Sequence, residues 1–179
     1  MLETKRLLLR PFTEADADDL YEYAKDPRVG PIAGWPVHTG VDNSREIIRT
    51  VFAAPNVFAV VDKAGGKVIG SAGFVGGDFP ELPGPANEIG YALSPAFWGR
   101  GLMPEAVNEL LRFGFEQLGL NAIWCSHYDG NQKSKRVIEK CGFRYRFSRE
   151  TEVTLMNERR LTHFYALIRE EWEERASRA

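Results

Sequence analysis

The stretch Ser94-Pro95-Ala96-Phe97-Trp98-Gly99-Arg100-Gly101-Leu102-Met103-Pro104-Glu105-Ala106 decides the predicted fold, because its glycine-punctuated turn runs directly into an amphipathic helix. Before it, residues 87–93 alternate as a strand does, with Tyr91 on the more apolar face. After it, apolar residues recur at helical spacing until Gly119, which is expected to end the helix. Strand, glycine turn and helix in this order predict an anion site, since glycines allow close backbone approach and a helix N-terminus favours phosphate.

Two familiar phosphate-binding folds do not fit the sequence. A P-loop needs Gly-Lys-Ser/Thr, which does not occur here. A dinucleotide fold needs a third glycine and an acidic residue at the end of the next strand, but the strand expected over 122–128 ends without one. A second helix follows, with Asn131 as its N-cap and Gly142 as its stop.

The two segments together resemble the GNAT superfamily of acetyl-CoA-dependent N-acetyltransferases, and within it the RimJ/RimL-like branch of ribosomal-protein N-terminal acetyltransferases. The likeness spans nearly the whole chain. It is carried by Thr4-Lys5-Arg6-Leu7-Leu8-Leu9-Arg10-Pro11, Ile89-Gly90-Tyr91, the turn from Trp98 to Ala106, Asn131-x-x-Ser134, Glu139-Lys140-x-Gly142-Phe143, and the segment from Tyr165 to Trp172. In the pyrophosphate signature Arg/Gln-x-x-Gly-x-Gly/Ala the chain has Trp98 first and Met103 last, and Met103 departs mildly from the pattern.

The expected architecture is α/β: a GNAT-like central mixed, mostly antiparallel sheet with one parallel strand-helix-strand crossover and helices on both faces. Parallel strands need such a crossover, which the order of residues 87–128 supplies. With 179 residues, the chain fits a single domain over 1–179.

The other expected elements follow from local patterns. They are a strand over 6–10 that Pro11 ends, a helix over 13–24, an ordered loop without regular structure over 26–39, a helix over 42–54, a hairpin of 57–62 and 67–75, a proline-rich loop over 79–86, two antiparallel strands over 145–155 and 160–168, and a charged helix from Arg169. The early acids of the first helix, Asp16 among them, are interpreted as a solvated face. The second helix is expected to bury Ile48 and Val51.

Composition indicates an ordinary soluble protein that works inside the cell. Hydrophobic residues make up 44% and charged residues 27%, and a net charge of −2 gives no general attraction to nucleic acid or membrane. Cys125 and Cys141 fit a reducing cytoplasm and lack metal-ligand spacing. No apolar run could span a bilayer and no signal peptide is recognised, so a cytoplasmic location is expected. A homodimer is left open.

The resemblance implies acetyl-CoA as cosubstrate and no metal. Its expected contacts are the backbone of Leu93 for the oxyanion, the turn residues Trp98, Gly99, Arg100, Gly101, Leu102 and Met103, Asn131 for the pantetheine arm, and Lys135, which with Arg100 would support the phosphates.

The resemblance also suggests catalytic groups. Glu88 is the first candidate for the base that deprotonates the amine, and solvent exposure or pairing with a cation is its structural alternative. Many relatives use a tyrosine as the acid, but Ile138 stands at that position, so the acid role passes to Ser134. His38 and His127 remain alternative bases.

The acceptor contacts expected from the resemblance are Trp35 and His38. The predicted function is transfer of an acetyl group to a primary amine, on a protein N-terminus or a small molecule, by direct attack in a ternary complex. A non-catalytic acyl-CoA sensor on the same fold is the alternative. The sequence does not distinguish among a protein N-terminus, a free amino acid, a polyamine and an antibiotic amine.

Overall fold

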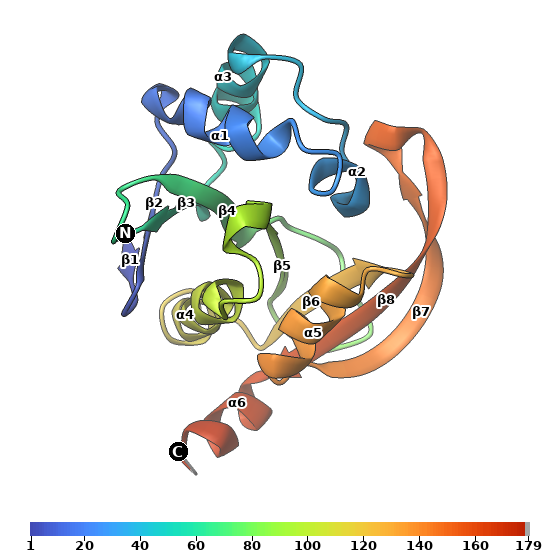
Figure 1. The fold of residues 1–179 in the computed structure, drawn as a ribbon. Coiled ribbons are helices and arrows are strands. Elements are labelled where there is room, and N and C mark those ends of the chain that lie inside the picture. Colours follow the sequence, from blue (N-terminus) through green and yellow to red (C-terminus); the bar gives the residue numbers. More distant parts are fainter. Residues whose placement is uncertain (178–179) are drawn as a thin grey trace.

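The computed structural model describes residues 1–177, and these form one sheet of eight strands in the order β1-β2-β3-β4-β5-β6-β8-β7 (Figure 1). The strands are β1 (Leu2–Glu3), β2 (Leu7–Arg10), β3 (Val57–Asp62), β4 (Val68–Phe74), β5 (Ala86–Leu93), β6 (Ala122–Tyr128), β7 (Arg144–Val153) and β8 (Glu158–Ile168). Neighbouring strands are antiparallel except β5 and β6, which are parallel. The predicted mixed, mostly antiparallel sheet is confirmed.

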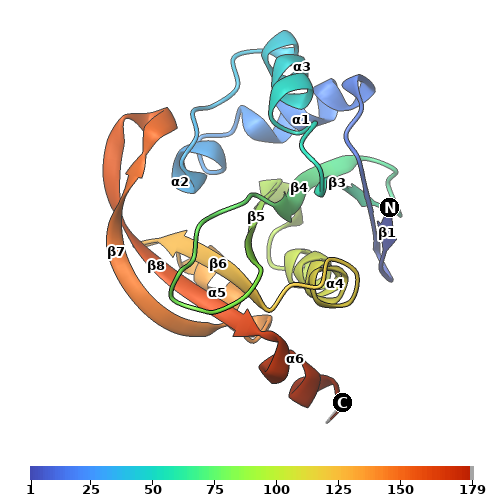
Figure 2. The ribbon, with the colours of Figure 1, turned by 180° about the vertical axis from the view of Figure 1, so that it is seen from behind.

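Helices cover both faces of this sheet. They are α1 (Ala17–Ala24), α2 (Gly30–Ala33), α3 (Val41–Thr50), α4 (Leu102–Glu116), α5 (Gln132–Lys140) and α6 (Arg169–Ala176), with short 3₁₀ turns at Glu14–Asp16, Pro95–Phe97 and Thr154–Met156. Helix α4 joins β5 to β6 and completes the predicted parallel crossover. Figure 1 and Figure 2 show α1 and α3 together on one side of the sheet and α4 on the other.

The core consists of two layers, one on each face of the sheet, and a third cluster under β6 and β8. On one face, Leu110 and Leu111 of α4 pack with Leu9 and Val60. On the other, α1 and α3 bury Leu20, Tyr23 and Ile48 against Ala59 and Val61. In the third cluster, Phe79 from the loop between β4 and β5 stacks on Trp124, with ring centroids 4.8 Å apart. The proline-rich segment therefore covers apolar sheet surface.

The segment 26–39 contains a short helix, so the prediction of a loop without regular structure is wrong there. Pro31 lies in the first turn of α2, where its missing N–H costs nothing, and Gly34 ends the helix in the left-handed conformation with φ 96°. Proline and glycine thus start and stop a helix here.

Two further local predictions need correction. Helix α3 ends at Thr50, and residues 51–53 form a turn ahead of Pro55, which leaves Val51 52% exposed. Asp16 is buried, and hydrogen bonds of 2.8 Å from the guanidinium of Arg10 to both of its carboxylate oxygens replace the lost contacts with water. The Asp16 carboxylate therefore fixes the start of α1 to β2 and does not belong to a solvated face.

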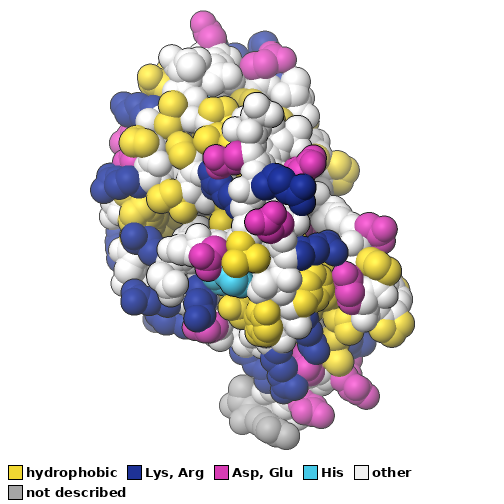
Figure 3. Space-filling view, turned by 90° about the vertical axis from the view of Figure 1, so that its right-hand side faces the viewer, with side chains coloured by type: hydrophobic (Ala, Val, Ile, Leu, Met, Phe, Trp, Pro, Cys, Tyr) yellow, Lys and Arg dark blue, Asp and Glu magenta, His cyan; other side chains and the backbone are white. Residues whose placement is uncertain are grey.

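The surface and the cysteines carry little specific information. Figure 3 shows basic and acidic side chains intermixed on one face, in keeping with the small net charge. Cys125 and Cys141 are both buried and free. Within residues 1–177, no helix has the length and hydropathy that a membrane span requires.

Candidate active site

Strands β5 and β6 separate after a short shared stretch, and this opens the sheet near its centre. Their parallel pairing covers residues 86–88 of β5, with Glu88 opposite Trp124 in the last pair. Beyond it, β5 stays paired with β4, and β6 stays paired with β8 as far as Tyr128. The facing edges of β5 and β6 thus have backbone groups without a strand partner in the described chain, and such edges can pair with an extended ligand.

A cavity of about 450 Å³ lies between this opening and the N-terminal ends of α4 and α5. Its lining includes most of the predicted ligand contacts, namely Leu93, Trp98, Gly99, Gly101, Leu102, Met103, Asn131 and Ser134. The first N–H groups of a helix have no intrahelical partner and carry partial positive charge. Two helix N-termini at one cavity therefore favour a negatively charged ligand.

The side chains that line this cavity strengthen its positive character. Four cations contribute to the lining: Arg28, Lys133, Arg136 and Lys140. No carboxylate among the described residues does so. The three cations from α5 are spaced i, i+3 and i+7, which puts them on one face of the helix.

Two cations predicted to support phosphates lie outside the lining. Lys135 is out of phase with the cationic face of α5, and its Nζ lies 3.9 Å from Oε1 of Glu139. The guanidinium of Arg100 lies over the ring of Phe97, 5.1 Å from its centroid. The cavity therefore has a cationic lining, but its cations are Arg28, Lys133, Arg136 and Lys140, and the predicted Arg100 and Lys135 are not among them.

The glycine turn owes its shape to backbone conformation. Gly99 and Gly101 adopt left-handed φ angles of 73° and 72°, which side chains disfavour. A Cβ added at Gly101 would meet only Nη2 of Arg6, at an ordinary 3.7 Å. Trp98 secures the turn, because its Nε1 donates a hydrogen bond of 2.8 Å to the carbonyl oxygen of Leu93.

A second cavity, of about 430 Å³, continues from the first toward the face that α1 and α3 cover. Its lining adds Trp35, Phe52, Val75, Glu88, Ser126 and Tyr128. Both cavities share the lining residues Ile32, Ala33, Tyr91, Ala92, Asn131 and Ser134. The two cavities are therefore adjacent, and ligands in them would meet beside Tyr91 and Ser134.

Glu88 is the one carboxylate that lines the second cavity within residues 1–177, and it forms no ion pair there. Its Oε1 accepts a hydrogen bond of 2.5 Å from Oγ of Ser126. Burial raises the pKa of Glu88, and the hydrogen bond from Ser126 and the charge of Arg149 partly oppose this. The carboxyl group lies where β5 and β6 part and faces a ligand-sized space.

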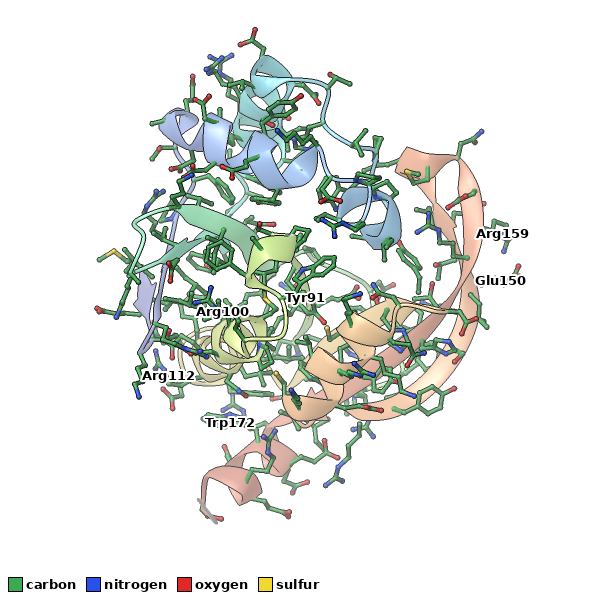
Figure 4. All side chains as sticks on the ribbon, in the orientation of Figure 1. Tyr91, Arg100, Arg112, Glu150, Arg159 and Trp172 are labelled. Carbon is green, nitrogen blue, oxygen red and sulfur yellow. The ribbon has the colours of Figure 1, made fainter. Side chains whose placement is uncertain are left out.

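Tyr91, which Figure 4 labels, forms a hydroxyl pair with Ser134 at the boundary of the cavities. The Tyr91 and Ser134 hydroxyl oxygens lie 2.8 Å apart, and the Tyr91 hydroxyl also donates to the carbonyl oxygen of Ser134 at 3.2 Å. Oδ1 of Asn131 accepts from the backbone N–H of Ser134 at 3.2 Å, as the predicted helix cap requires. Burial raises the pKa of Tyr91 well above its ordinary value, so the phenol stays protonated.

Comparison with known proteins gives this geometry a family. A family profile described as "Acetyltransferase (GNAT) domain" matches residues 6–144. The chain belongs to the GNAT acetyltransferase family. The uncharacterized N-acetyltransferase p20 of Bacillus licheniformis is 32% identical to this acetyltransferase over 147 residues, which are 79% of this chain and 81% of p20.

Solved structures agree with this assignment. The crystal structure of a GNAT-family acetyltransferase from Bacillus anthracis has a TM-score of 0.82 at 26% identity, covering 95% of this chain and 99% of that one. The ribosomal-protein-S5-alanine acetyltransferase from Vibrio fischeri has a TM-score of 0.74 at 22% identity, covering 95% and 97%. The second likeness shows a common fold alone.

Neither His38 nor His127, the alternative bases, lines either of these two cavities of the acetyltransferase. His38 is buried, its Nδ1 lies 2.8 Å from Oγ of Ser44, and its ring packs against Trp35. Nδ1 of His127 lies 2.9 Å from the carbonyl oxygen of Tyr128. Burial lowers the pKa of both histidines. Of the two predicted acceptor contacts, Trp35 lines the second cavity, whereas His38 only supports Trp35.

Sequence reasoning about this acetyltransferase missed Tyr91 and Ser126 as site residues. In the sequence, each occupies an ordinary strand position. Only the tertiary fold brings Tyr91 to Ser134 and Ser126 to Glu88. The cations of α5 did carry a signal, because Lys133 and Lys140 flank Arg136 at helical spacing.

Proposed function

We propose that this acetyltransferase moves the acetyl group of acetyl-CoA to a primary amine by direct attack in a ternary complex. The observation that carries the proposal is the opposite charge of two adjoining cavities. Within residues 1–177, cations and no carboxylate line the first, and one carboxylate and no lysine or arginine lines the second. A polyanionic cosubstrate suits the first cavity, and an ammonium group suits the second.

The first cavity has features that fit three parts of acetyl-CoA, namely the pyrophosphate, the pantetheine arm and the thioester carbonyl. The N-terminus of α4 and the turn through Gly99 and Gly101 offer backbone N–H groups for a pyrophosphate. The open edges of β5 and β6 offer hydrogen bonds to an arm that contains amides. The N–H of Leu93, at the end of β5, is the proposed donor to the developing oxyanion.

Glu88 is the proposed base. Amines have a pKa of roughly 8–10, so most acceptor molecules arrive protonated at neutral pH. A carboxylate in the second cavity attracts the ammonium and accepts its proton, directly or through a water molecule. Because burial raises the pKa of Glu88, this carboxylate is a stronger base than an exposed glutamate.

The Tyr91–Ser134 pair is the proposed acid. Acetyl-CoA supplies a thioester, whose carbon–sulfur bond breaks as the amine nitrogen bonds to the acetyl carbon. The pair donates a proton to the leaving sulfur and regains one from solvent, and the protons lost by the amine leave through Glu88. The phenol of Tyr91 is protonated at neutral pH, since burial raises its pKa further above the ordinary value of a tyrosine.

Ser134→Ala is expected to lower kcat by about 10- to 100-fold while acetyl-CoA affinity changes little, since an acid acts mainly in the transition state. The loss stays moderate because the phenol of Tyr91 remains. The measurement is steady-state kinetics together with calorimetric titration of acetyl-CoA. Ser148→Ala is the matched control, because Ser148 lies on β7 outside both cavities. Equal losses of kcat and affinity in Ser134→Ala would make Ser134 a structural residue.

We further propose that this acetyltransferase belongs to the RimJ/RimL-like branch and acts in the cytoplasm. Support comes from Trp98 at the head of the pyrophosphate signature and from the Asn131-x-x-Ser134 motif. The Vibrio fischeri ribosomal-protein acetyltransferase has the same fold. The complete set of Glu88, Tyr91 and Ser134 favours catalysis over an acyl-CoA sensor.

A screen of amine acceptors tests the proposed function. Purified protein is incubated with acetyl-CoA and a panel of small amines and peptides with free N-termini, and released CoA is measured against a buffer control. Release that depends on an amine, with the acetylated amine found by mass spectrometry, is expected. Tight binding of acetyl-CoA without release by any amine would support the sensor.

A further inference from the structure

We propose that the preferred acceptor is a primary amine with a single positive charge on an apolar body. An arylalkylamine and a peptide N-terminus with an apolar first side chain are two sources of that chemistry. The inference rests on the proposed function, because it takes the second cavity as the acceptor site. Polyamines, aminoglycoside-like polycations and zwitterionic amino acids are then poor acceptors.

The charges around the second cavity indicate an acceptor with a single positive charge. Glu88 supplies the only negative charge on its wall within the described chain, so a second ammonium would lie in the cavity without a counter-charge. A carboxylate on the acceptor would face Glu88, and no lysine or arginine among residues 1–177 lines the cavity to receive it. One ammonium and no other charge is the arrangement that this cavity satisfies.

Two arginines close to lining residues of the second cavity are engaged with other groups. Nη1 of Arg160 donates to the carbonyl oxygen of Pro31 at 2.8 Å, and its guanidinium lies over the ring of Tyr128. Arg149 lies 3.5 Å from Glu81 and over the rings of Phe147 and Phe164. Neither arginine reaches the cavity wall.

The apolar lining of the second cavity indicates an acceptor with an apolar body. Trp35, Phe52 and Val57 contribute hydrocarbon to the lining of the cavity, whose volume of about 430 Å³ is in the range of small-molecule sites. Ile32 and Val75 also line it, and they are 45% and 61% exposed. Large apolar side chains left open at the wall of a cavity are expected where a ligand with an apolar body covers them.

Matched pairs of acceptors test the inference. 2-Phenylethylamine is compared with phenylalanine, which adds a carboxylate, and hexylamine with 1,6-diaminohexane, which adds an ammonium. The value of kcat/KM is expected to be about 10- to 100-fold higher for the singly charged member of each pair. Peptides that begin with phenylalanine or aspartate form the third pair, in which the phenylalanine peptide is expected to be the better acceptor. A higher kcat/KM for 2-phenylethylamine than for this peptide identifies an arylalkylamine as the source, and the reverse identifies a peptide N-terminus.

A variant that supplies the missing counter-charge sharpens the test. Val75→Asp adds a carboxylate at an exposed position of the wall and is expected to raise kcat/KM for 1,6-diaminohexane relative to hexylamine by about tenfold. Val51→Asp is the control, because Val51 is 52% exposed but lies outside the cavity, and it should leave this ratio unchanged.

Equal or better use of the diamine and of phenylalanine by the parent protein would overturn the inference. Calorimetric titration of the same amines in the presence of CoA separates this failure from failure of the proposed function. If no amine releases CoA, the proposed function fails. The titration then still tests the inference, because it measures the order of the amine affinities independently of turnover. Tighter binding of the singly charged amines supports the inference, and equal binding contradicts it.

Discussion

Gly101→Val is expected to abolish acetyl-CoA binding while the chain stays folded. Gly101 precedes α4 in a left-handed conformation, and a branched side chain there would strain the turn and obstruct the helix N-terminus. The protein itself leaves room for a Cβ, so the cost to stability is mainly backbone strain of about 1–2 kcal/mol, small against the 5–15 kcal/mol of a typical domain.

Arg100→Ala is the matched control for this turn. The side chain of Arg100 (labelled in Figure 4) lies over the ring of Phe97 and outside the cavity lining. Its removal should therefore weaken acetyl-CoA binding no more than a few-fold. Circular dichroism first establishes that both variants are folded, and calorimetric titration then measures acetyl-CoA affinity. A folded Gly101→Val protein that binds like the parent would refute the backbone site, as would a larger loss in Arg100→Ala.

Glu88→Gln is expected to lower kcat/KM by about 10²–10⁴, the usual contribution of a general base. An amide can still accept the hydrogen bond from Ser126, so the local structure should persist. The base acts only when ionised, and burial raises its pKa, so the activity of the parent should rise with pH through a value above that of ordinary glutamate. The variant should lose this acidic limb.

Glu150→Gln provides the control for the pH–rate profile. Glu150 is on β7, its side chain is 66% exposed, and Figure 4 shows it at the outer edge of the molecule. The profile of this variant should match that of the parent. Persistence of the acidic limb in Glu88→Gln would remove Glu88 from the role of base and would require a group outside the cavity lining.

Local sequence signals predicted the frame of the site well. The turn through Gly101 needs left-handed backbone, and the side chain of Asn131 caps its helix, so both positions follow from short-range chemistry. The parallel crossover follows from the order strand, helix, strand. The turn and the cap depend on neighbouring residues, and the crossover follows a general rule of chain topology, which is why the sequence sufficed for all three.

Features that depend on contacts between distant segments could not be read in this way. The Tyr91–Ser134 pair spans 43 positions, and the hydrogen bond from Ser126 to Glu88 spans 38. Asp16 was mistaken for a solvated acid for another reason: its partner Arg10 is only six positions away, but the turn between β2 and α1 that brings the two side chains together is not evident from the residue pattern. Lys135 lies close to the Asn131-x-x-Ser134 motif in sequence, but it is out of helical phase with Lys133, Arg136 and Lys140, which line the cavity.

Initial-velocity kinetics with acetyl-CoA and an accepted amine both varied tests the central claim most directly. Two adjoining cavities share Tyr91 and Ser134, and the proposed function places one substrate in each, with direct attack in a ternary complex and no acetylated enzyme. Double-reciprocal plots are therefore predicted to intersect. Parallel lines, the mark of a ping-pong mechanism, together with acetylated protein in the absence of amine, would contradict the account.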